Sequence, residues 1–377
     1  MKGILHKEFG KCVSRGFLLI VAACLSLTAC TDDADSQSDR EEGDLLQLIP
    51  FVRQTEEMST RADVVPDDYV PFTNVYPIAE GEKPSFGIFL AEPGTTAPDK
   101  MGMITYQGLD VENKDVWRSY VEVKQKSYYV YGYLPAEAAE GGATLEPYNG
   151  DFANGAVMTI KDLPAAATYD VCVITGIQDA TSANAEIDLH LGKFAYQGKP
   201  KGQNYIGVLL DHLYSEIDFQ FKVDERYNRQ RHIRLKKMTL KSVGRDKVTA
   251  TVRIVGNNTD SDPIEHLAWT ANGGTSDAVL FENEAGVLVT TNAESFGQLR
   301  GFAMPAASNS LLLECIYDVY DIEDNLVRRN CKAENDLSLR VADLKRGEMS
   351  EVTLTVRPTY LYVLSEPDMD NPTVVMN

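Results

Sequence analysis

Strict alternation of apolar and polar residues is the feature of this sequence that most restricts its fold. Between residues 214 and 223, Ile217, Phe219, Phe221 and Val223 alternate with charged or amide side chains. A period of two places the two kinds of side chain on opposite faces of a strand. The segment therefore predicts a β-strand with one buried and one solvated face, and neither a long helical period nor an internal repeat is found along the chain.

The same alternation recurs in residues 248–254 and 311–319. Residues 128–134, 171–174 and 352–356 are predicted to be further strands. Between Ile233 and Leu240 the apolar phase changes at Lys236-Lys237, which predicts a β-bulge. Many short strands separated by turn residues favour an all-β fold built from β-sandwiches. The polar, Gly- and Pro-containing stretch 197–203 places a domain boundary near residue 205, with sandwiches at 62–205 and 206–357.

The first 29 residues have the organisation of a lipoprotein signal peptide. A basic start precedes an apolar run over residues 17–29, which is shorter than the ~20 residues of a membrane span. The run ends in Leu27-Thr28-Ala29-Cys30, a pattern that resembles a bacterial lipobox. We predict a signal peptide at 1–29 and lipidation of Cys30. An ordinary secretory signal is the alternative, and Cys24 is the less favoured lipidation site.

Residues 30–61 join an acidic stretch to a strongly apolar one. The acidic stretch lacks aromatic residues and is expected to be a tether. The apolar stretch is expected to form a strand that shields a groove, and its Pro50 predicts an edge position, since proline has no N–H for a sheet ladder. Its groove-filling side chains are Leu46, Leu48, Ile49, Phe51 and Val52.

Charge and motif content argue against several function classes. The chain has 56 acidic and 36 basic residues, a net charge of −20, which disfavours nucleic-acid binding. It contains no nucleophile elbow, zinc-protease motif or phosphate-binding loop. His212 lies in an apolar segment and is interpreted as a structural histidine. Neither an enzyme nor a metal or other cofactor is therefore expected.

Several blocks of the sequence resemble the fimbrillin family, the lipoprotein-derived major and minor pilin subunits. The blocks are the aromatic strand 128–134 with Pro135, Asp170-Val171-Cys172-Val173, residues 209–219, Ala303-Met304-Pro305, and residues 344–356. The resemblance implies two transthyretin-like β-sandwiches in tandem. It also implies a precursor anchored by lipid in the outer membrane, cleaved after an arginine by an Arg-specific surface protease, and assembled with other pilin subunits into fimbriae. Arg61, followed by Ala62, stands where that cleavage is expected.

The segment after Arg357 is longer than a closing strand requires. Residues 358–377 contain two β-prone runs, formed by Tyr360, Leu361, Tyr362, Val363 and Leu364 and by Val374 and Val375. With the resemblance, we favour donation of this tail to a neighbouring subunit, in a homo- or heteropolymer, over folding back as edge strands. The alternative function is an uncleaved surface lipoprotein that acts as a pilus anchor, a tip adhesin or a glycan-binding module.

Two cysteines are predicted to face each other in a hairpin. Residues 311–320 and 326–332 are predicted to form a hairpin around the three-residue loop 322–324, so that Asp321 faces Asn325. If that register continues, Cys315 lies opposite Cys331, and an oxidising compartment permits a disulfide between them. Two reduced thiols are favoured over this possible disulfide, because cross-strand bridges are strained, and Cys172 is expected to be a buried free thiol.

Overall fold

A computed structural model gives the structure of this chain. It describes residues 44–57, 66–72, 84–109, 115–182, 185–256, 262–293, 299–305, 310–339 and 345–356. These residues form an all-β fold of four sheets, as predicted. Short helices occur at Pro66–Asp68 (η1), Ala136–Ala138 (η2), Tyr148–Gly150 (η3), Phe152–Asn154 (η4) and Glu225–Asn228 (α2). No helix among the described residues has the length and apolar character needed to cross a membrane.

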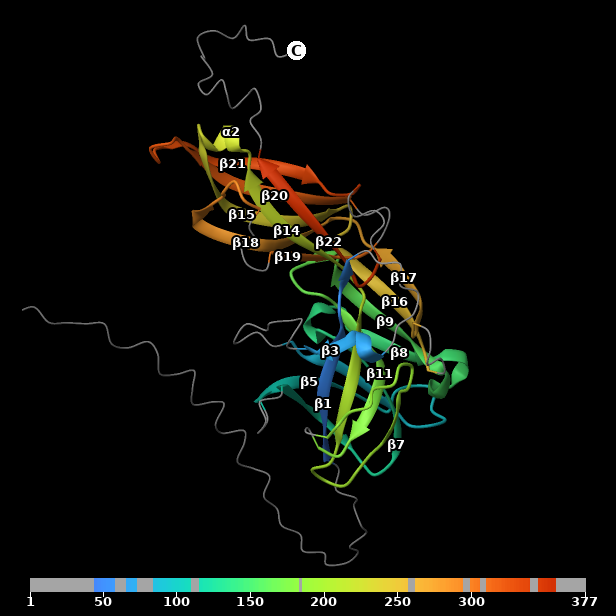
Figure 1. Cartoon of the computed structure of the whole chain (residues 1–377). Coiled ribbons are helices and arrows are strands. Elements are labelled where there is room, and N and C mark those ends of the chain that lie inside the picture. Colours follow the sequence, from blue (N-terminus) through green and yellow to red (C-terminus); the bar gives the residue numbers. More distant parts are fainter. Residues whose placement is uncertain are drawn as a thin grey trace, which may run out of the picture. The chain divides into compact units, whose positions relative to one another are not determined.

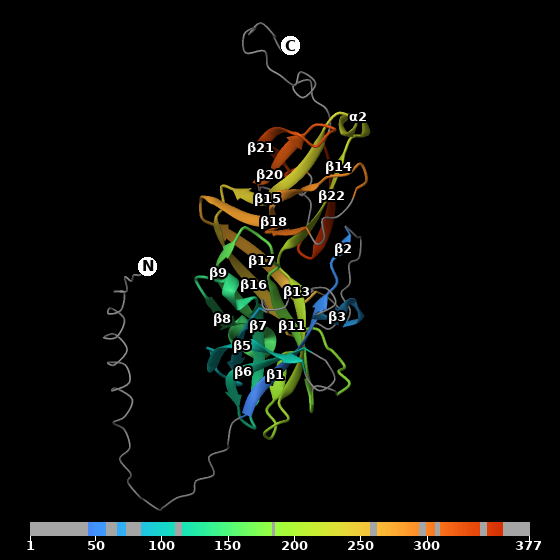
Figure 2. The same cartoon turned by 90° about the vertical axis from the view of Figure 1, so that its left-hand side faces the viewer.

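The first sandwich packs a nine-stranded sheet against a four-stranded sheet (Figures 1 and 2). The larger sheet has the order β11-β13-β1-β6-β5-β4-β7-β12, with β3 beside β1, and a short β7–β11 pairing closes it on itself. Its strands are β1 (Asp44–Arg53), β3 (Tyr69–Pro71), β4 (Phe86–Ala91), β5 (Lys100–Leu109), β6 (Asp115–Val123), β7 (Ser127–Leu134), β11 (Cys172–Ala180), β12 (Ala195–Gln197) and β13 (Tyr205–His212). The smaller sheet contains β8 (Ala143–Pro147), β9 (Gly155–Pro164), β16 (Lys247–Val255) and β17 (Ile264–Ala271).

The second sandwich packs a five-stranded sheet against another four-stranded sheet, around a separate apolar core. The five-stranded sheet has the order β10-β19-β14-β22-β2. Its strands are β2 (Glu56–Glu57), β10 (Ala166–Ala167), β14 (Ser215–Val223), β19 (Arg300–Ala303) and β22 (Glu348–Val356). The facing sheet contains β15 (His232–Val243), β18 (Thr275–Leu288), β20 (Ser310–Tyr320) and β21 (Leu326–Asp336).

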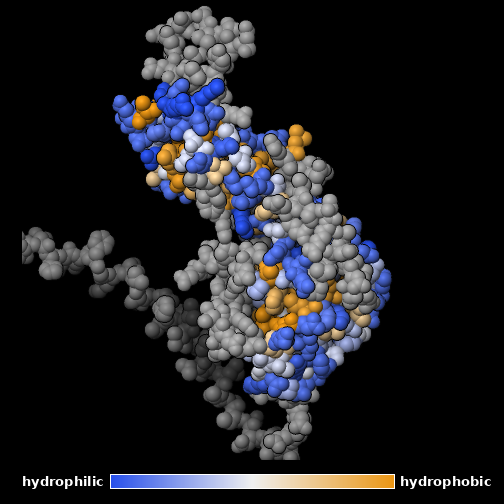
Figure 3. Space-filling model, viewed as in Figure 1, coloured by the Kyte–Doolittle hydropathy of each residue, from blue (hydrophilic) through white to orange (hydrophobic). Residues whose placement is uncertain are grey.

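In the view of Figure 3, the surface is mainly hydrophilic, with smaller apolar areas.

Individual strands follow the alternation of the sequence. In β14, Ile217, Phe219, Phe221 and Val223 are all buried in the second core. The bulge predicted at Lys236-Lys237 is confirmed, because β15 shifts its register between Leu235 and Lys237 against both β18 and β20. The shift lets residues of both apolar phases face one core.

Strand pairing crosses the boundary expected near residue 205. Tyr205 begins β13, which pairs with β11 and β1 in the first sandwich. The β16–β17 hairpin also belongs to that sandwich, because β16 pairs with β9. The polar stretch 197–203 is thus a connection between β12 and β13 within one sheet, and residues 205–212 and 247–271 complete the first sandwich.

The β20–β21 hairpin begins in the predicted register and then departs from it. Asp321 N donates to Asn325 O at 2.9 Å across the loop. Two register shifts follow, and Cys315 comes to face Ala333 while Cys331 faces Tyr317. The two cysteines are therefore offset along the strands, and both are buried free thiols. The predicted register, in which the two cysteines face each other, is wrong, because alternation alone does not reveal bulges on the partner strand.

Candidate functional site

The candidate site is the first strand, β1, with the groove that holds it. We use groove for the space between β13 on one side of β1 and β6 and β3 on the other. On one side β1 pairs in parallel with β13, from Gln47↔Tyr205 to Val52↔Leu210. On the other side it pairs with β6 and then with β3. The strand that was expected at an edge is therefore an interior strand of the nine-stranded sheet.

The pairing of β1 leaves a place for Pro50 at this interior position. Gln47 N donates to Asn204 O, on the side of β13. Because backbone N–H groups alternate sides along a strand, the nitrogen of Pro50 faces the opposite side. There the β6 pairing ends at Leu48 and the β3 pairing begins at Phe51, so Pro50 lies in the gap between them. The missing N–H removes no ladder hydrogen bond at this point.

Both faces of β1 are covered. Leu46, Leu48 and Val52 are fully buried in the core of the first sandwich. On the opposite face, Ile49 is buried and Phe51 is partly buried, packed against smaller apolar clusters that include Ile187, Leu189, Leu191, Tyr205 and Leu209. Burying a large apolar side chain contributes about 1.5–3 kcal/mol, so the four most buried of these stabilise the folded chain by roughly 6–12 kcal/mol as an upper bound.

The last residue of β1 is held by two consecutive residues of β13. His212 donates from Nε2 to the carbonyl oxygen of Arg53, at 2.6 Å. The Arg53 guanidinium lies 3.7 Å from Oδ2 of Asp211. Both the backbone and the side chain of Arg53 are thus bound at the end of the groove.

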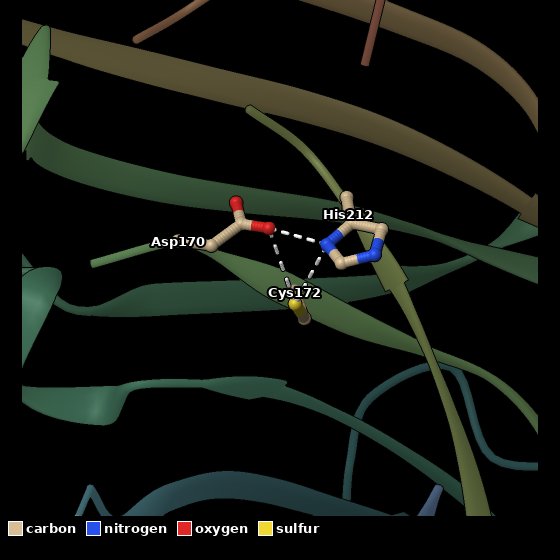
Figure 4. Close-up of side chains that lie close together, drawn as sticks. All are labelled: Asp170, Cys172 and His212. Atoms are coloured by element: carbon tan, nitrogen blue, oxygen red, sulfur yellow. Dashed lines mark hydrogen bonds and ion pairs between the residues drawn. The ribbon is translucent and has the colours of Figure 1, made fainter. Parts of the chain in front are cut away.

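His212 is fully buried, and Figure 4 shows its ring beside Asp170 and Cys172. Its Nδ1 hydrogen-bonds to Oδ2 of Asp170, and the Sγ atom of Cys172 lies 3.8 Å from both of these atoms. Burial by itself lowers the pKa of His212, but the carboxylates of Asp170 and Asp211 more than offset it, so the pKa is raised. A carbonyl on one side and a carboxylate on the other fit an imidazolium that donates from both ring nitrogens. The structural interpretation of this histidine agrees with its contacts.

Asp170, Cys172 and His212 also offer three atoms suited to binding a metal, all within 4.8 Å of one another. No fourth His, Cys, Asp or Glu joins this group in the part of the chain that the structure describes. Both ring nitrogens of His212 already contact oxygen atoms. The arrangement fits a buried imidazolium–carboxylate pair better than a four-ligand tetrahedral site.

Asp211 links the groove to the start of β22. Arg346 donates to its Oδ1 at 2.8 Å and also contacts the carboxylate of Asp262. Burial alone raises the pKa of Asp211, but Arg346 and Arg53 lower it, and the net pKa lies below the ordinary value. We call Arg53, Asp170, Asp211, His212, Asp262 and Arg346 the polar clamp.

Sequence reasoning identified the residues of β1 but not the polar clamp. The available signal was the pair Asp211-His212 inside the apolar run 206–213, since buried charges require partners. Their partners lie far away in the sequence and were not identifiable from spacing. Cys30, Arg61, Ala62 and the tail residues 360–364, 374 and 375 lie outside the described residues.

Comparisons with known proteins give weak similarity. No protein-family model matches the chain, and no curated protein matches it. Among solved structures, a fimbrial protein from Bacteroides vulgatus is 14% identical with a TM-score of 0.38, covering 82% of this chain and 95% of that one. Candidate cell adhesion proteins from Bacteroides uniformis (13%, TM-score 0.37) and Bacteroides fragilis (9%, TM-score 0.40) each cover 84% of this chain and 94% of theirs. Similarity at this level assigns neither a family nor a function.

Proposed function

We propose that this chain is a structural pilin subunit, not an enzyme, whose first strand is removed and replaced by a strand from a neighbouring subunit. The observation that supports this most directly is the position of β1. It is an interior strand, buried on both faces, yet it lies at the N-terminal end of the described chain. Arg61 follows shortly after β2, so cleavage there would separate β1 from the rest of the chain, together with the two-residue strand β2 that pairs with β22.

Loss of β1 would open a groove that needs a new occupant. The backbone groups of β13 and β6 that pair with β1 would lose their partners, and the apolar core would be exposed along the groove. An extended strand from another chain can restore both the pairing and the burial by β-augmentation. Residues 358–377, with their two β-prone runs, are our candidate for the strand that this chain donates.

The remaining steps of the proposal concern export and location. The signal peptide and Cys30 would deliver the precursor to the outer membrane with a lipid anchor, and an Arg-specific surface protease would then cleave after Arg61. The cleaved subunit would become part of a fimbrium on the cell surface, where it would serve adhesion. A subunit that kept residues 30–61 would instead remain as an anchor, a tip adhesin or a glycan-binding lipoprotein.

Substitution of Arg61 tests the role of cleavage. Arg61→Lys keeps the positive charge but removes the residue that an Arg-specific protease requires, so cells carrying it should show monomers or only short assemblies. Arg229→Lys, at an arginine with a 79% exposed side chain, is the matched control and should assemble normally. Pili of normal length on cells with Arg61→Lys would contradict the proposal.

Deletion of residues 358–377 should preserve cooperative unfolding yet stop polymerisation if the tail is donated.

A further inference from the structure

The end of the groove beside Arg53 carries an unbalanced carboxylate whenever β1 is absent. Asp211 is fully buried. Its Oδ1 accepts from Arg346 and from the backbone of His212. Its Oδ2 accepts no hydrogen bond from any described residue, and the Arg53 guanidinium is the cation beside it, at 3.7 Å. Arg346 is the nearer cation to the Asp211 carboxylate, and Arg53 is the second cation, on the side of Oδ2.

The charges of the polar clamp balance only while β1 is present. Three carboxylates, of Asp170, Asp211 and Asp262, are matched by Arg53, Arg346 and protonated His212. Of these six groups, only Arg53 belongs to the removable strand. Its side chain is 15% exposed and that of Asp211 is fully buried, so water screens the pair poorly. A replacement strand without a cation would leave three carboxylates matched by two cations, Arg346 and protonated His212.

At the other end of β1, the groove binds a negative charge instead of a positive one. Oδ2 of Asp44 accepts from the backbone N–H of Gly202 at 2.6 Å and from the side-chain amide of Asn204 at 2.9 Å. The groove thus binds a carboxylate at the start of the strand and a cation at its end. This polarity distinguishes the two directions in which a strand can be inserted.

The tail of this chain lacks the required cation. After Arg357, which directly follows the last residue of β22, residues 358–377 contain Glu366, Asp368 and Asp370 but neither Lys nor Arg. A second copy of this chain that donated these residues would fill the apolar positions and leave Oδ2 of Asp211 without a cation.

We infer that the groove of this subunit selects its replacement strand by charge and is filled by a different pilin-type chain. That strand carries Lys or Arg at the position of Arg53. Its core-facing apolar residues lie an odd number of positions along the strand from this cation, as Leu46, Leu48 and Val52 do from Arg53, and therefore point to the opposite face. The inference rests on the proposed removal of β1. It implies a heteropolymer at this groove, with this chain's own tail donated to a subunit of another kind.

Peptide exchange into the cleaved protein tests the selection. The full chain carrying Cys30→Ala is cleaved by an Arg-specific protease, the protease is inhibited, and labelled peptides are added. The probes are the peptide of residues 43–54, the same peptide with Arg53→Met or Arg53→Lys, and the peptide of residues 358–377. We expect the Arg and Lys peptides to bind about tenfold more tightly, or better, than the Met peptide and the tail peptide.

Asp211→Asn in the full chain is the matched variant. It keeps the shape of the side chain and removes the charge, so the preference for Arg over Met should disappear. Equal binding of the Arg, Met and tail peptides to the unsubstituted protein overturns the inference while strand exchange still stands. A preference that persists in Asp211→Asn also overturns it. If no peptide enters the cleaved protein, including that of residues 43–54, strand exchange itself is contradicted, and the inference falls with it.

Discussion

Nε2 of His212 donates a hydrogen bond to the carbonyl oxygen of Arg53, 2.6 Å away, and so joins β13 to the last residue of β1. His212 and Arg53 are 159 residues apart in the chain, and the bond is buried next to Asp170. The first strand is thus bound at its end by a titratable group as well as by backbone pairing and apolar contacts along its length.

Protonation of His212 should make the retention of β1 depend on pH. Because the folded-state pKa of His212 is raised, its contribution to stability is fully present below the ordinary pKa of about 6.5 and is lost as pH rises through the raised value. We expect the backbone amides of β1 to be protected from hydrogen exchange less at alkaline pH than at pH 6, after correction for the intrinsic exchange rate. In His212→Asn this pH dependence should be absent. An unchanged pH dependence in that variant would show that another group is responsible.

Truncation of an inward-facing side chain of β1 should destabilise the uncleaved precursor. Leu48 is fully buried, and Leu48→Ala should cost about 2–5 kcal/mol in the free energy of unfolding. Leu45 lies on the same strand with 39% exposure, so Leu45→Ala should cost much less and serves as the matched control. Chemical denaturation of both variants checks this. Equal losses would mean that β1 is not packed in the core of the precursor.

The three sheet cysteines should all be free. Burial, together with the charge of Glu314, raises the pKa of the Cys315 thiol to about 12, which makes it unreactive in the folded protein. Unreduced protein, denatured before labelling, should therefore yield thiols at Cys172, Cys315 and Cys331. Labelling at Cys172 alone would indicate a bond between the other two and would require a different register in the β20–β21 hairpin.

Lipidation should depend on Cys30. Cys30→Ala is expected to abolish incorporation of labelled palmitate and delivery to the cell surface. Cys24→Ala is the matched control, because Cys24 also ends a short apolar run with small residues before it. Palmitate incorporation that continues in Cys30→Ala and stops in Cys24→Ala would move the lipidation site to Cys24.

The strands that face water on one side were the predictable part of the fold. In β14 and β15 the alternation of side chains, including the bulge at Lys236-Lys237, follows directly from which residues are buried. The run at 205–212 has no such alternation, because β13 is covered on both faces. An apolar run of this kind indicates burial without specifying a partner. Its place beside β1 was therefore not predictable from the sequence.

The polar clamp shows the same limit for the site. Asp170, Asp211 with His212, and Arg346 lie in three of the sequence blocks that resemble the fimbrillin family, and the fold brings them together around Arg53. Taken alone, each of these blocks has the sequence pattern of an ordinary strand or turn. The charges within them become informative only when their long-range partners are known, because a buried charge and its counter-charge need no particular separation in sequence.

The N-terminal sequence of the protein sheared from the cell surface tests the central claim most directly. If β1 is removed by cleavage after Arg61, the first residues should be Ala62-Asp63-Val64. A surface protein that instead begins at an acylated Cys30 and still contains residues 44–53 would show that β1 is retained, and would contradict the assembly of this chain by strand replacement.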